Sequence, residues 1–142
     1  MHRAILLVTV SLAALAIAAT ALPATTTASQ HVSLVVKSDV EHAKKGSDGK
    51  WHDAFLPANF TVRAGSRVVV TARNYDAAPH MIMAPKLGLM VTLGKGSARH
   101  PSTTTFTFTP KTRGTFTWRC TEPCDPWAMT RVGYMTGRIT IT

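Results

Sequence analysis

The sequence predicts an all-β protein, a Greek-key β-sandwich of seven or eight strands preceded by a signal peptide. Three observations support this prediction. Short runs rich in Val, Thr and Phe recur between Gly and Pro residues, as in sandwiches and barrels. In residues 103–109, Thr-Thr-Thr-Phe-Thr-Phe-Thr, the alternation places Phe106 and Phe108 on one face. No stretch of ordinary helix length shows amphipathic periodicity. With 142 residues, 45% of them apolar, the chain is long enough for one ordered domain.

Residues 1–28 are expected to form a signal peptide. A short basic start, Met1-His2-Arg3, precedes an uncharged apolar run over residues 4–19. Ala19-Thr20-Ala21 then gives the small-residue pattern of a cleavage site. The alternative is an uncleaved anchor, because the run is nearly long enough to span a bilayer. We therefore expect a secreted or periplasmic protein whose only membrane contact is through this segment.

The charge balance narrows the classes of partner. The chain has 16 Lys and Arg against 7 Asp and Glu, a net charge of +9. This excess favours an acidic protein partner. The basic residues are scattered and follow no nucleic-acid-binding motif, so nucleic acid is not expected as a partner. No nucleotide loop, nucleophile elbow or zinc-protease motif is present, so we do not expect an enzyme. A monomer is expected.

The exported part divides into two regions. Residues 29–50 contain a strand, His31–Val36, followed by a polar loop with one helical turn near residues 40–43. Residues 51–142 contain the remaining strands and form the main domain. Each predicted strand is a short β-rich or alternating run bounded by turn residues. These strands cover residues 60–62, 67–73, 80–84, 89–93, 103–109, 115–120 and 137–142.

Two segments carry the residue types that bind soft metals. His80 opens the first segment, and Cys120 and Cys124 lie in the second, followed by Met129 and Met135. Imidazole, thiolate and thioether together are the ligands that copper prefers, copper(I) in particular. Loops at one end of a sandwich converge in space, so the two segments are expected to meet. The sequence therefore predicts a copper site built from these five residues.

The same segments resemble the cupredoxin family. Residues 74–80, Asn-Tyr-Asp-Ala-Ala-Pro-His, are similar to the loop that brings the first copper histidine in that family. Residues 116–120 resemble the strand that delivers the copper thiolate, and residues 133–141 the axial methionine followed by the last strand. Residues 55–65 resemble its early strands. The resemblance covers roughly residues 51–142.

The resemblance implies one-electron transfer through a mononuclear copper centre. It implies that His80 is the imidazole ligand, Cys120 the thiolate and Met135 the weak axial ligand. The chain departs from the family because no second histidine follows Cys120. The run Cys-Thr-Glu-Pro-Cys resembles the binuclear copper loop of cytochrome c oxidase subunit II. However, Ala128 and Arg131 stand where that loop has its histidine and methionine.

Three interpretations of the cysteine pair remain open. Cys124 replaces the missing histidine, giving His80, Cys120, Cys124 and either Met135 or Met129 as ligands. Alternatively, Cys120 and Cys124 form a disulfide, which suits an exported protein. In the third case both are free thiols without a ligand role. The ligand interpretation is compatible with electron transfer or with extracytoplasmic copper(I) storage or delivery, and the disulfide gives a metal-free cupredoxin-shaped module. A redox or copper-donor protein is the expected partner.

The other candidate ligands are expected to be structural. The isolated histidines are expected to be solvated: His31, His42, His52 and His100. The remaining methionines are expected to pack, with Met81 and Met83 on the face opposite His80 because side chains alternate along a strand.

Overall fold

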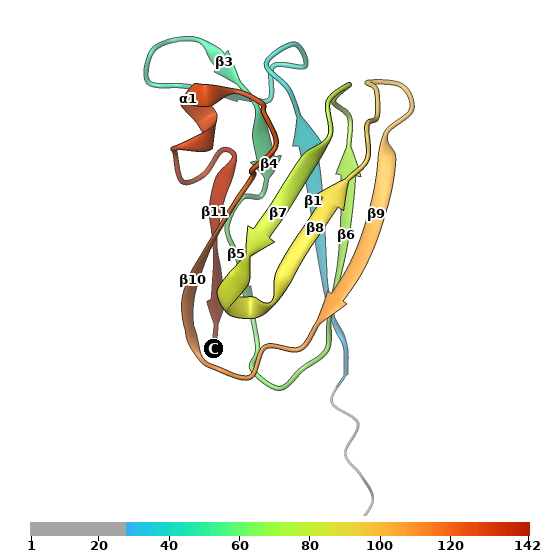
Figure 1. Ribbon diagram of the computed structural model, residues 1–142, viewed down its shortest axis with the longest axis vertical. Coiled ribbons are helices and arrows are strands. Elements are labelled where there is room, and N and C mark those ends of the chain that lie inside the picture. Colours follow the sequence, from blue (N-terminus) through green and yellow to red (C-terminus); the bar gives the residue numbers. More distant parts are fainter. Residues whose placement is uncertain (1–27) are drawn as a thin grey trace, which may run out of the picture.

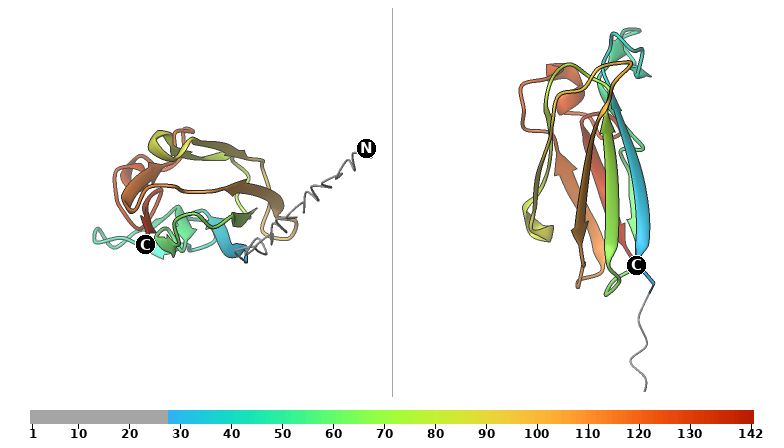
Figure 2. Two further views of the ribbon diagram at one scale, coloured as in Figure 1. Left: turned by 90° about the horizontal axis from the view of Figure 1, so that it is seen from below. Right: turned by 90° about the vertical axis from the view of Figure 1, so that its right-hand side faces the viewer.

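The computed structural model describes residues 28–142, which form two β-sheets packed face to face (Figures 1 and 2). The all-β sandwich predicted from the sequence is confirmed. The predicted signal peptide lies outside the described residues. Within residues 28–142, no helix is long and apolar enough to cross a membrane.

The first sheet has four strands in the order β4-β1-β6-β9. The parallel pair β1 and β6 forms its centre, with seven residue pairs in register from Gln30–Val68 to Val36–Asn74. The antiparallel strands β4 and β9 pair on either side. The bounds are Gln30–Lys37 for β1, Ala54–Leu56 for β4, Val68–Asn74 for β6 and Ser102–Phe108 for β9.

The second sheet has five strands in the order β5-β11-β10-β7-β8. It carries the predicted ligands, because β7 starts at His80 and β10 ends at Arg119, directly before Cys120. The bounds are Phe60–Val62 for β5, His80–Ala84 for β7, Leu89–Leu93 for β8, Gly114–Arg119 for β10 and Thr136–Ile141 for β11.

The core lies between the two sheets. Alternation along β6 buries Val68, Val70 and Ala72, and these face the buried residues of the second sheet. Trp118 is the largest fully buried side chain, and its ring meets Phe55 edge to face at 4.6 Å. Its indole N–H donates to the carbonyl of Ala58 at 2.9 Å, which satisfies its one polar atom. Trp118 therefore fixes β10 to the core two residues before Cys120.

All eight predicted strands are present, and the sandwich has one more. The additional strand is β4, which the sequence does not mark because its three residues lie between Asp53 and Pro57 and show no alternation. The predicted helical turn near residues 40–43 is wrong in type, since residues 39–42 form hydrogen-bonded turns. The polar loop also contains a two-residue pairing of β2 (Lys44–Lys45) with β3 (Trp51–His52).

Two short helical segments complete the fold. A 3₁₀ turn, η1 (Pro85–Leu87), connects β7 to β8, and α1 (Pro126–Met129) follows the second cysteine. Strand β3, helix α1 and the start of β7 all lie at the same end of the sandwich, opposite the C-terminus (Figure 1). This end therefore gathers the segments that carry the predicted metal ligands.

Candidate metal centre

His80, Cys120 and Cys124 meet at this end of the sandwich. Their ligand atoms all lie within 4.8 Å of one another. The Sγ of Cys120 is 3.8 Å from Nδ1 of His80 and 3.5 Å from the Sγ of Cys124. His80 and Cys120 are buried, whereas Cys124 is half-buried. The predicted convergence of the two segments is therefore present in the structure.

Cys120 lies in an environment that stabilises its thiolate. Cys124 donates its S–H to the Sγ of Cys120, and the backbone N–H of Met81 donates to the same sulfur at 3.4 Å. These donors and the imidazole of His80 lower the pKa of Cys120 although burial opposes the shift. The pKa of Cys124 is raised, because this thiol donates to Cys120 and is itself partly buried. The surroundings therefore favour the thiolate form of Cys120 over that of Cys124.

His80 is oriented by a carboxylate on its far side. Its Nε2 is 2.8 Å from Oδ2 of Asp76, while its Nδ1 faces Cys120. Burial lowers the pKa of His80, but the bonds to Cys120 and Asp76 outweigh that effect and raise it. A carboxylate on the second ring nitrogen of a metal-binding histidine fixes its tautomer and ring orientation. The geometry presents Nδ1 as the nitrogen available to a metal.

A buried amide holds the loop that leads to His80. Asn74, at the end of β6, is fully buried. Its side-chain N–H groups donate to the carbonyls of Ala78 and Gly94, at 2.8 and 2.9 Å, and its Oδ1 accepts from the N–H of Asp76. This network fixes the backbone around Asp76, the partner of His80. The loop is therefore held in place without any metal.

The segment after Cys124 is held by a capped helical turn. Asp125 is the N-cap of α1, and its side chain accepts from the backbone N–H groups of Trp127 and Ala128. Pro126 occupies the first helical position, where no N–H is needed. The cap fixes the backbone immediately after the second thiol.

The two predicted thioether ligands occupy different positions. Met135 is fully buried, and its backbone carbonyl accepts from the N–H of Cys120 at 2.8 Å. Met129 ends α1 and is half-buried against the core. The backbone of Met135 thus lies directly beside Cys120. The ligand roles of both thioethers stay predictions.

The prediction that His52 is solvated is wrong. Only 6% of this residue is exposed, and its ring stacks on Trp127 with centroids 3.9 Å apart. Nδ1 lies 2.5 Å from Asp125 and Nε2 3.0 Å from Asp48. Local sequence could not reveal this, because Asp125 is far along the chain and reaches His52 only through the fold. The histidine connects the β2–β3 segment to the loop that follows Cys124.

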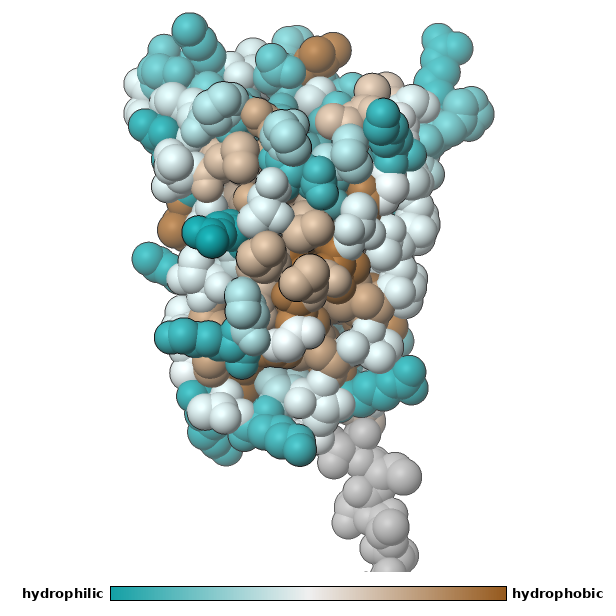
Figure 3. Space-filling model, in the orientation of Figure 1, coloured by the Kyte–Doolittle hydropathy of each residue, from teal (hydrophilic) through white to brown (hydrophobic). Residues whose placement is uncertain are grey.

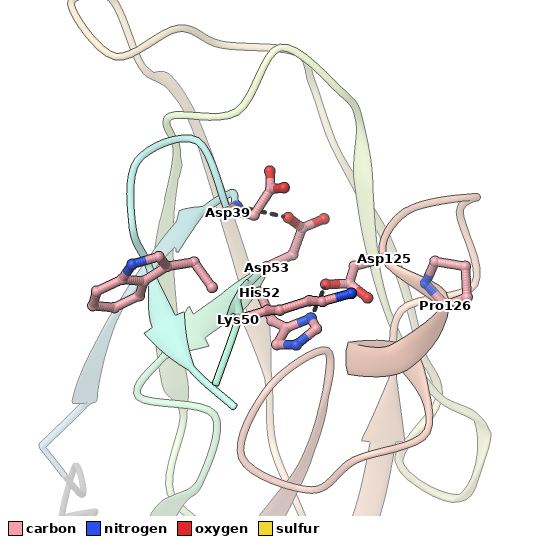
Figure 4. A pocket seen from close by; sticks show the side chains of 7 residues that line it. Asp39, Lys50, His52, Asp53, Asp125 and Pro126 are labelled. Atoms are coloured by element: carbon pink, nitrogen blue, oxygen red, sulfur yellow. Dashed lines mark hydrogen bonds and ion pairs between the residues drawn. The ribbon is translucent and has the colours of Figure 1, made fainter. Parts of the chain in front are cut away.

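A cavity of about 400 Å³ lies beside this contact (Figure 4). Asp53 and Asp125 line it, and Asp53 accepts from the backbone N–H of Asp39 at 3.0 Å. Its lining residues do not include His80 or either cysteine. The cavity therefore lies beside the candidate metal centre and is a separate feature.

We expect the ion pairs of His52 to make stability depend on pH. Burial lowers the pKa of His52, but its bonds to Asp48 and Asp125 outweigh burial and raise it. Because the pKa of His52 is higher in the folded state, its ion pairs stabilise the fold fully below about pH 6.5. This stabilisation is lost as the pH rises through the pKa that His52 has in the folded protein. The free energy of unfolding of the metal-free protein, compared between wild type and His52→Gln, should differ most near pH 6. The difference should shrink above the folded pKa.

Asp48→Asn provides the control for this prediction. It removes one of the two carboxylates and should move the pKa of His52 back toward the ordinary value, as followed by NMR titration of the imidazole. A difference between wild type and His52→Gln that is constant from pH 5.5 to 9 would contradict the ionic interpretation.

A comparison with protein families includes His80, Cys120 and Cys124 in its match, whereas Met135 lies beyond the matched range. A family model described as a cupredoxin-like domain matches residues 6–129. No curated protein sequence matches the chain significantly.

Solved structures give the same fold. The chain is similar to the metal-binding domain of the Cu(I)-exporting P-type ATPase CopA of Streptococcus pneumoniae D39, with a TM-score of 0.52, 16% identity and coverage of 80% of this chain and 86% of that chain. It is similar to reduced auracyanin from Roseiflexus castenholzii, with a TM-score of 0.52, 19% identity and coverage of 82% and 99%. A blue copper oxidase from Nitrosomonas europaea gives a TM-score of 0.59 and 17% identity over 80% of this chain and 39% of that one. At these identities the matches show a shared fold.

Proposed function

The chain belongs to the cupredoxin-like domain family, and from this we propose that it binds one copper ion and transfers single electrons. One observation carries the proposal: an imidazole and two cysteine sulfurs, brought from two loops, lie within 4.8 Å of one another. His80, Cys120 and Cys124 are the proposed ligands, and Met135 is the proposed weak axial ligand.

The chemistry of these donors fits copper. Thiolate and imidazole together select copper or zinc, and a thioether favours copper. The pKa of Cys120 is lowered by the hydrogen bond from Cys124 and by His80, so this thiol gives up its proton to a metal ion more readily than an ordinary cysteine. His80 presents Nδ1 while Asp76 holds its other nitrogen. A copper ion bound here supplies a one-electron couple.

The rigidity of the site favours electron transfer. The Asn74 network fixes the loop before His80, and the Asp125 cap fixes the loop after Cys124. His80 and Cys120 are 0% and 1% exposed, so water and competing ligands are excluded from them. Ligands that hold the same positions in both oxidation states keep reorganisation small. We further propose that the protein acts outside the cytoplasm with an acidic redox or copper-donor protein.

Copper(I) storage or delivery is the second candidate function. It is favoured by the donor set, because two cysteine sulfurs replace the usual pairing of one thiolate with two imidazoles. Cys124 is also half-buried, so a partner's thiol has a route to the centre. Electron transfer requires Cys124 to stay bound to the metal, whereas metal release requires a partner's thiol to replace it.

The metal-free module with a disulfide remains the third possibility. The two cysteines are free thiols in the structure, with sulfurs 3.5 Å apart. Forming a Cys120–Cys124 disulfide would remove both sulfur donors from a metal. Mass spectrometry of the native protein distinguishes this state by the loss of two hydrogens.

The proposal is tested by loading the protein with copper. We expect a thiolate-to-copper charge-transfer band with Cu(II) and a reversible one-electron wave in voltammetry. His80→Ala should remove both, whereas His42→Ala, at an exposed position, should retain them. Tight copper(I) binding without a reversible wave would favour delivery. Absence of copper binding in the reduced protein would overturn both copper functions.

A further inference from the structure

Three of the chain's six methionines lie on the outer face of one hairpin. Along β7, His80, Ile82 and Ala84 point into the core, so Met81 and Met83 point outward. Across the hairpin, Met90 on β8 is the Cα partner of Met83. The three side chains therefore occupy neighbouring positions on one face, and we name them the thioether row.

The row is open to solvent. Met90 is 72% exposed, and Met81 and Met83 are half-buried. The space-filling view shows apolar surface gathered in the middle of the face formed by β7 and β8 (Figure 3). On β8, the buried side chains of Leu89 and Leu93 point into the core. The hairpin thus places Leu and Ile inside and Met outside.

One end of the row lies beside the buried thiol. The backbone N–H of Met81 donates to the Sγ of Cys120, at 3.4 Å. The hydroxyl of Thr121, the residue after Cys120, donates to the Sδ of Met81 at 2.9 Å. Met81 therefore contacts the ligand segment through both its backbone and its side chain.

We propose that the thioether row is a second, transient binding site for Cu(I), through which the ion reaches the buried centre. The inference rests on the proposed function, since it assumes that His80 and the two cysteines are the destination. Thioethers are soft, neutral ligands that suit Cu(I) and need no deprotonation. A site of thioethers alone binds more weakly than one with thiolates, so the ion moves toward the centre.

The burial of the centre explains why such a site is useful. His80 and Cys120 expose almost no surface, so a Cu(I) ion delivered by a partner cannot contact these two ligands directly, and of the three only Cys124 is partly exposed. Arg119, the Cα partner of Met83, is exposed and opposes a cation. Because Arg119 is exposed to water, that repulsion is strongly screened, and it weakens binding without preventing it.

The first test uses Ag(I), a soft closed-shell cation, on protein labelled with ¹³C at the methionine methyl groups. It is done in the Cys120→Ser/Cys124→Ser variant, which lacks the thiols of the centre. We expect the methyl signals of Met81, Met83 and Met90 to shift on titration. Unchanged signals from these three residues would overturn the proposal.

The second test measures how fast the wild-type centre takes copper from a Cu(I)–chelator complex. Leu is close in volume to Met but has no sulfur, so the triple variant M81L/M83L/M90L keeps the apolar surface. We expect its loading to slow by about tenfold or more, with the final affinity of the centre unchanged. An unchanged rate would overturn the proposal. If Met→Ser at these positions slows loading and Met→Leu does not, the face is an apolar docking surface and the thioether site is wrong.

The two proposals fail in different ways. If the reduced wild-type protein takes no Cu(I) from the chelator, the proposed function fails, whether or not Ag(I) shifts the methyl signals. If it takes Cu(I) but the row neither responds to Ag(I) nor affects the rate, only the thioether row is wrong.

Discussion

Cys120→Ser is expected to lower the affinity of the protein for Cu(I) by at least about 10³-fold, or ~4 kcal/mol. The Sγ of Cys120 is the central donor, since it lies near His80 Nδ1, Cys124 Sγ and the N–H of Met81 at once. A hydroxyl in its place stays protonated and is a hard, weak ligand for a soft cation. The charge-transfer band with Cu(II) should disappear as well. Competition with a Cu(I) chelator measures the affinity.

Cys124→Ser is the matched control for this prediction. It makes the same chemical change four residues away, at the half-buried and protonated thiol. We expect a smaller loss of affinity and a surviving charge-transfer band from the Cys120 thiolate. Equal copper binding by wild type and Cys120→Ser would contradict the ligand assignment.

The metal-free stability separates ligand loss from unfolding. Cys120→Ser places a hydroxyl at a site that already offers hydrogen-bond partners, so the free energy of unfolding should fall by only about 1–2 kcal/mol. A copper-affinity loss that exceeds this change cannot come from destabilisation alone.

The strands could be predicted because their own residues carry the signal. β9 alternates Thr with Phe, and β10 places Phe116 and Trp118 on one face, so each sequence determines which side is buried. β4 could not be predicted, since its three residues form a strand only by pairing with β1. Pairing partners distant in sequence leave no local pattern.

The candidate site was predictable for a similar reason. His80, Cys120 and Cys124 are chemically distinctive residues at strand ends, and a sandwich brings such ends together. Of the residues that support them, Asn74 and Asp76 lie in the loop that the resemblance marks. Asp125 and His52 were not recognised, because Asp and His are common on surfaces. Asp125 had one usable signal: an Asp directly before a Pro is typical of a helix N-cap. The contact between Asp125 and His52 depends on the whole fold.

Gly137→Ala is expected to destabilise the protein by about 3 kcal/mol or more. Gly137 is buried in β11 and pairs with Trp118 in β10. A Cβ at this position would lie well inside contact distance of the carbonyl oxygen of Ala58 and of the indole ring of Trp118. These are the two groups joined by the indole hydrogen bond. The added methyl therefore forces apart a buried backbone segment and the largest side chain of the core.

The displacement should also reach the metal centre. Trp118 packs on Phe55, whose ring meets His80 edge to face at 6.1 Å. Urea unfolding of the metal-free protein measures the loss, with Gly94→Ala as control, because a Cβ there meets only the side chain of Ser102 at 3.8 Å or more. The control should change stability by less than about 0.5 kcal/mol. If the two variants unfold at the same urea concentration, the close packing of β11 against Trp118 is wrong, and so is the rigid support inferred for Cys120.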